Sequence, residues 1–99
     1  MKSLKSLMLL APLALLVSCA APQELTKDGM KVKVYGSKPP SDCEVQAKVV
    51  GHHDLGSVEL ARNHARNQVA SKGANAITFD EEVQNGKQFR VHATGYMCP

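Results

Sequence analysis

The segment from Ser57 to Phe79 restricts the fold more than any other part of the chain, because a helix pattern, a helix stop and a strand pattern follow one another there without a gap. Apolar residues recur at three- or four-residue spacing and line one narrow stripe of a helix: Val58, Ala61, Ala65 and Val69. Asp54 or Ser57 can cap this helix, and Gly73 can take the left-handed conformation that ends it. From Ile77 onward apolar and polar residues alternate. The segment predicts an amphipathic helix leading directly into a strand.

Alternation elsewhere predicts three more strands. Two of them precede the helix, at Met30–Tyr35 and Cys43–Val50, and the lysines of the first are typical of a protected sheet edge. Asn85-Gly86 predicts a two-residue hairpin turn, and Phe89–Thr94 alternates after it. We therefore expect a small single α+β domain in the order β-β-α-β-β, with one helix packed on a small mixed sheet.

The first 18 residues have the pattern of an export signal. Lys2 and Lys5 precede an apolar run from Leu7 to Val17, which is shorter than the roughly 20 residues that span a bilayer. The run ends in Leu-Val-Ser-Cys19, which resembles the lipobox of bacterial lipoproteins. In that motif the cysteine receives a diacylglyceryl group, becomes the first mature residue, and later receives one further acyl chain such as palmitate. The alternative is an ordinary secretory signal with an incidental cysteine.

Lipid attachment at Cys19 predicts a domain organisation and a location. Residues 1–18 would be the lipoprotein signal peptide, residues 19–29 a lipidated tether without periodicity, and residues 30–99 the folded domain. Ala20 follows the cysteine, where an aspartate resembles a signal for retention in the inner membrane. We therefore expect an outer-membrane protein that is lipid-anchored and faces the periplasm.

Charge and cysteine content limit the possible partners. Without Lys2 and Lys5, 10 of the 12 basic residues remain against 9 acidic ones, so the mature chain is nearly neutral and nucleic acid is not an expected partner. With Cys19 acylated, Cys43 and Cys98 form an even pair in an oxidising compartment, which predicts a disulfide. The alternative, a redox or metal-binding pair, lacks the close Cys-x-x-Cys spacing of such sites.

The sequence contains no pattern typical of a catalytic site, so we expect a protein that is not an enzyme and needs no cofactor. Adjacent His52 and His53, in a predicted loop, and His92, on the last strand, leave a metal-binding or metal-dependent role open as an alternative. His64 lies off the apolar stripe of the helix. Solvated surface histidines are the simpler interpretation of all four.

Two further polar groups have simple interpretations. The helix carries a ribbon of arginines and asparagines that is typical of a solvated face, although such a ribbon can dock a partner: Arg62, Asn63, Arg66 and Asn67. The acidic run from Asp80 to Glu82 is most simply an exposed strand end.

The sequence ARNHARNQVASKGANAI, with Asp42-Cys43 and the final Gly-Tyr-Met-Cys98-Pro, resembles the uncharacterised short enterobacterial lipoproteins typified by YjeI. More distantly, the helix leading into Gly73-Ala74 is similar to RcsF, an outer-membrane lipoprotein that senses envelope damage. The second resemblance implies a small disulfide-bonded α/β domain, but RcsF-type domains carry four cysteines and a long proline-rich tether. The expected role is therefore non-enzymatic binding, envelope-stress sensing or structural support, with an unidentified envelope protein as a possible partner.

Overall fold

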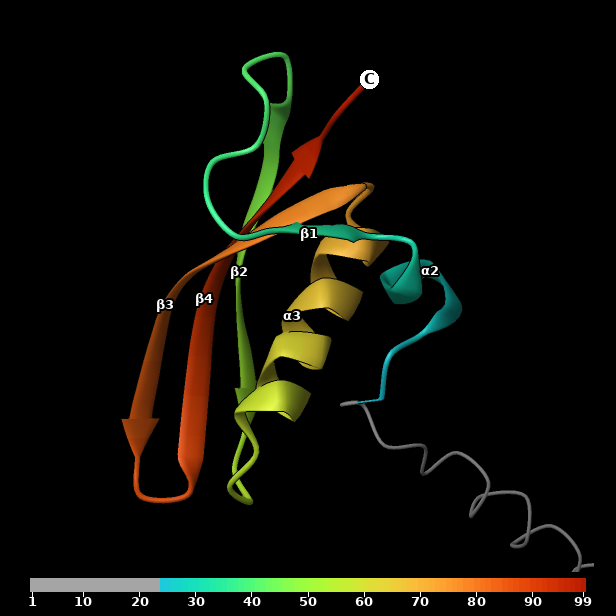
Figure 1. The fold of residues 1–99 in the computed structure, drawn as a ribbon. Helices are drawn as coiled ribbons and strands as arrows, with labels where there is room; N and C mark the ends of the chain where they lie inside the picture. Colours follow the sequence, from blue (N-terminus) through green and yellow to red (C-terminus); the bar gives the residue numbers. More distant parts are fainter. Residues whose placement is uncertain (1–23) are drawn as a thin grey trace, which may run out of the picture.

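The computed structural model describes residues 24–99 (Figure 1). The export signal and Cys19 lie outside the described residues. In chain order the elements are α2 (Lys27–Met30), β1 (Lys33–Tyr35), β2 (Glu44–His53), α3 (Val58–Ser71), β3 (Ala76–Asn85) and β4 (Gln88–Met97). The expected β-β-α-β-β order is confirmed, and the described residues add one short helix before it.

The four strands form one mixed sheet in the order β1-β3-β4-β2. β4 pairs antiparallel with both β2 and β3, whereas β1 pairs parallel with β3. β2 and β3 therefore run parallel, with β4 between them, and α3 carries the chain from one to the other. Figure 1 shows α3 packed along one side of this sheet, and within residues 24–99 no helix covers the other face.

α3 forms where the apolar stripe predicts it. Ser57 caps its first turn, because the Ser57 hydroxyl accepts from the Leu60 N–H at 3.1 Å. Ala61, Ala65 and Val69 are fully buried, and Gly73 ends the helix with a φ of 91°. The helix prediction is confirmed at both ends and on its buried face.

Two strand glycines allow α3 to lie very close to the sheet. A Cβ at Gly51 would lie 2.3 Å from the Ala61 carbonyl oxygen, and one at Gly95 would lie 2.7 Å from Val69 Cβ. This close approach compensates for small core side chains, because short contacts keep a core of alanines and valines densely packed. The largest fully buried side chains are Ile77, Val69 and Val91.

The β3–β4 hairpin is confirmed, but its turn lies one residue later than predicted. Asn85 pairs with Gln88, so the two-residue loop is Gly86-Lys87. Gly86 has a φ of 64° while Lys87 has a negative φ, which is the type II′ arrangement with glycine at the first central position. Asn85 therefore belongs to the strand.

β2 is longer than predicted and less regular. It continues to His53, which places both adjacent histidines in the strand and corrects the prediction of a loop there. Its pairing with β4 shifts between Val45 and Ala47, so Gln46 is an extra residue. This bulge breaks the alternation, and Val45, expected on the buried face, is 60% exposed.

The domain begins earlier than residue 30, so the predicted tether over residues 19–29 was too long. The Asn67 amide donates to the Glu24 carbonyl oxygen at 2.7 Å, and its oxygen accepts from the Thr26 N–H at 2.9 Å. The Thr26 hydroxyl caps α2 by accepting from the N–H of Gly29, which is buried. These contacts hold residues from Glu24 onward against α3.

The arginines of α3 also bind neighbouring segments, which corrects the prediction of a solvated ribbon. Arg66 donates to the Val32 carbonyl oxygen at 3.1 Å, just before β1. Arg62 forms a two-bond ion pair with Glu82 of β3, at 2.5 and 2.8 Å. That hydrogen-bonded pair raises the pKa of Arg62 and lowers the pKa of Glu82. Both groups are partly exposed, so we expect the pair to contribute less than about 1 kcal/mol.

The predicted disulfide is present. Cys43 and Cys98 are bonded, with their Cα atoms 4.1 Å apart and a sequence separation of 55. The bond joins the residue before β2 to the residue after β4. Because Glu44 pairs with Met97 beside it, the bond closes the end of the β2–β4 pair opposite the hairpin turn.

Candidate functional site

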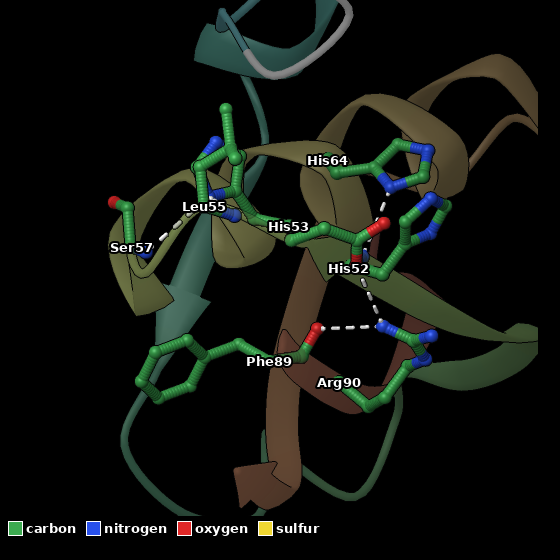
Figure 2. Close-up of polar contacts among 8 residues, drawn as sticks. His52, His53, Leu55, Ser57, His64, Phe89 and Arg90 are labelled. Atoms are coloured by element: carbon green, nitrogen blue, oxygen red, sulfur yellow. Dashed lines mark hydrogen bonds and ion pairs between the residues drawn. The ribbon is translucent and has the colours of Figure 1, made fainter. Parts of the chain in front are cut away.

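His53 shapes the connection between β2 and α3. Its side chain is 8% exposed, and its Nδ1 accepts from the backbone N–H of Leu55 at 3.4 Å and of Ser57 at 3.2 Å (Figure 2). A ring nitrogen that accepts cannot carry a proton, so the neutral ring has its hydrogen on Nε2. The expectation of a solvated histidine is wrong at this position.

His64, in α3, also accepts a backbone hydrogen bond through its Nδ1. Its Nδ1 accepts from the His52 backbone N–H at 3.0 Å, and the two imidazole rings meet edge to face with centroids 4.7 Å apart (Figure 2). Burial lowers the pKa of His64, and the neighbouring His52 ring lowers it further. Burial thus favours the neutral ring, whose Nδ1 ties α3 to the edge of the sheet.

These hydrogen bonds restrict what metal chemistry the histidines can perform. A neutral imidazole has one ring nitrogen with an available lone pair. In His53 and His64 that nitrogen is Nδ1, and it already accepts hydrogen bonds from backbone N–H groups. His53 faces the helix side, whereas His92 is exposed on β4. His53 and His92 therefore lie on opposite faces of the sheet, and within residues 24–99 no three His, Cys, Asp or Glu side chains converge on a metal position.

The His64 hydrogen bond predicts a pH-dependent stability. The folded pKa of His64 is lower than its ordinary value of about 6.5, so its contribution is complete above that pH and is lost as the pH falls toward the folded pKa. Urea unfolding followed by circular dichroism should give a lower free energy of unfolding at pH 5 than at pH 7.5. His64→Gln should make this decline shallower, and the exposed control His92→Gln should leave it unchanged. An identical decline in His64→Gln would contradict the assignment.

A second polar group lies on the sheet face that α3 does not cover. Thr78 of β3 and Thr94 of β4 are direct partners across the sheet and are only 6% and 4% exposed. Their hydroxyls hold the two oxygens of one carboxylate: Thr78 donates to Asp80 Oδ1 at 2.8 Å, and Thr94 donates to Oδ2 at 2.6 Å. The Tyr96 hydroxyl lies 3.4 Å from that of Thr78. We call Asp80, Thr78, Thr94 and Tyr96 the Asp80 cluster.

A bulge in β3 produces this arrangement. The β3–β4 register shifts between Phe79 and Glu81, so Asp80 is the extra residue. Asp80 is exposed, but its carboxylate is fixed on both sides. The acidic residues from Asp80 to Glu82 are exposed as predicted, but they lie within β3 and not at its end, and hydrogen bonds hold Asp80 and Glu82.

Beside the Asp80 cluster the sheet has a shallow hollow of about 270 Å³. It is lined by Lys48, Val49, Val50, Asp80, His92 and Ala93. The hollow is thus lined by the carboxylate of Asp80, a lysine and a histidine, with Val50 as an exposed apolar side chain. The sequence could not show it, because the bulge that places Asp80 depends on the pairing of two strands.

Within residues 24–99 no helix is long and apolar enough to cross a membrane. No family model, no curated protein and no solved structure matches this chain.

Proposed function

We propose that this protein is a lipoprotein of the bacterial envelope, anchored in the outer membrane through Cys19, which binds a ligand or partner without catalysing a reaction. The Leu-Val-Ser-Cys19 motif supports the anchor, and Ala20 supports the outer membrane as destination. The Asp80 cluster and its hollow support binding at the uncovered sheet face, which we call the binding face. It comprises the Asp80 cluster with Lys48, Val50 and His92.

The observation that carries the binding role is the fixation of Asp80 by two buried hydroxyls. A buried hydroxyl needs a hydrogen-bond partner, and its desolvation is otherwise unfavourable by about 1–3 kcal/mol. Valine would serve a strand equally well without that requirement. Thr78 and Thr94 instead hold an exposed carboxylate in one orientation, which is the preorganisation that a binding site needs.

The early start of the domain limits how far it can lie from a lipid anchor on Cys19. Glu24 is already held by Asn67, and only five residue steps separate it from Cys19. Five residues span at most about 18 Å when fully extended. A lipid on Cys19 would therefore keep the domain beside the membrane surface.

Membrane fractionation tests the anchor. On a sucrose gradient, the protein expressed in a bacterium with two membranes should sediment with the outer membrane, and Cys19→Ser should leave an uncleaved precursor held by its apolar segment. Ala20→Asp should move the protein to the inner membrane. A Cys19→Ser variant that is processed normally into soluble periplasmic protein would overturn the lipoprotein proposal.

A further inference from the structure

We infer that the hollow on the binding face takes a small zwitterion, a free amino acid or the equivalent charged groups of a short peptide, with the ammonium group at Asp80 and the carboxylate at Lys48. This inference rests on the proposed binding role and names its ligand class. It does not depend on where the protein is anchored, so it can fail while the anchor proposal stands.

The Asp80 carboxylate has free capacity for an ammonium group. An ionised carboxylate offers about four acceptor positions, and the two threonine hydroxyls use one on each oxygen. The remaining positions belong to an exposed group that cannot rotate away without losing both hydrogen bonds. A primary ammonium donates up to three hydrogen bonds and gains from the full negative charge.

Lys48 supplies the opposite charge on the same face. It pairs with Thr94 across β2 and β4, so its side chain leaves the sheet on the side of the Asp80 cluster. The ion pairs within residues 24–99 are Arg62–Glu82 and Arg90–Asp54, which leaves the Lys48 ammonium available to a ligand carboxylate. His92 lines the same hollow and can donate a hydrogen bond.

The size of the hollow selects a small ligand. Sites for drug-sized molecules occupy about 300–1,000 Å³, and this hollow of about 270 Å³ lies just below that range. Its floor includes Val50, which is 40% exposed and against which a short aliphatic side chain can pack. A single amino acid or a peptide end matches both the volume and the pair of charges.

The test uses the full chain purified in detergent and labelled with nitrogen-15, titrated with alanine while backbone amide shifts are recorded. Propionate and ethylammonium serve as matched half-ligands, because each lacks one of the two charges of alanine. Alanine should shift the amides of Val49, Val50 and His92 with a Kd in the millimolar range, as expected for a small ligand in an open site. Each half-ligand should bind at least about tenfold more weakly, because it loses one charge-assisted contact.

Variants assign the two charges. Asp80→Asn should weaken alanine binding at least about tenfold and abolish the ethylammonium response while propionate still binds, and Lys48→Gln should do the reverse. The exposed control variants Asp28→Asn and Lys38→Gln should bind as the unchanged chain does. If Asp80→Asn fails to fold, Lys48→Gln still tests the inference. No hydrogen bond or ion pair within the described residues involves the Lys48 side chain, so this variant is expected to fold. Unchanged binding in Lys48→Gln, or equal binding of alanine and propionate, would overturn the inference.

Discussion

Replacing Gly51 by alanine is expected to destabilise the domain by about 3 kcal/mol, the upper part of the range for overpacked cores. The added Cβ would lie 2.3 Å from the Ala61 carbonyl oxygen and 2.6 Å from the Ala65 backbone nitrogen. Both atoms belong to the α3 backbone, so no side-chain rotation relieves the contact and the helix must move off the sheet. A small domain has only about 5 kcal/mol or slightly more to lose.

The matched control is Gly36→Ala. A Cβ at Gly36 would meet nothing within 4 Å, and its backbone is not in the left-handed region. Its free energy of unfolding should stay within about 0.5 kcal/mol of the unchanged protein. Urea unfolding of both variants, followed by circular dichroism, measures this difference in stability. Equal midpoints would show that α3 does not pack on β2 through Gly51.

Removal of the disulfide should have an effect of similar or greater size. The Cys43–Cys98 bond joins residues that are 55 apart in sequence. In the entropic model, closing a loop of that length raises the free energy of the unfolded chain by about 4 kcal/mol. In a domain of this size, each kcal/mol shifts the thermal midpoint by about 4–8 °C. The Cys43→Ser, Cys98→Ser double variant should therefore melt roughly 15–30 °C lower, or fail to fold at 37 °C.

Reductant provides the control for this prediction. It should lower the thermal midpoint of the unchanged protein toward that of the double variant, and it should leave the double variant unaffected. Alkylation followed by mass measurement should find both thiols masked before reduction. A double variant that melts with the unchanged protein would show that the bond contributes nothing to stability.

The helix and the order of the elements along the chain could be predicted because their signals are local. The apolar stripe that ends in Val69, the helix stop at Gly73 and the alternation from Ile77 lie within one continuous segment. The disulfide could be predicted because the expected compartment leaves Cys43 and Cys98 as an even pair. Each of these predictions needs only a pattern among neighbouring residues or the number of cysteines.

The features that the sequence did not reveal depend on contacts between distant residues. Asn67 donates a hydrogen bond to Glu24, which is 43 residues away in sequence. Nothing in the sequence near either residue indicates that the end of the predicted tether is folded. The bulges at Gln46 and Asp80 arise from the register between strands. His53 was expected in a loop because the alternation of β2 ends in a glycine, yet Gly51 is in the strand to admit α3. Most of the candidate site therefore became visible only in the folded chain.

The mass of the intact protein extracted from bacterial membranes tests the proposed anchor most directly. We expect a chain that begins at Cys19 and is heavier than residues 19–99 by a diacylglyceryl group and one further acyl chain. Fragmentation should place all of the added mass on Cys19, with Cys43 and Cys98 joined. A mature chain that begins at another residue, or a Cys19 without lipid, would contradict the proposal that this domain is held at the envelope membrane through its N-terminal cysteine.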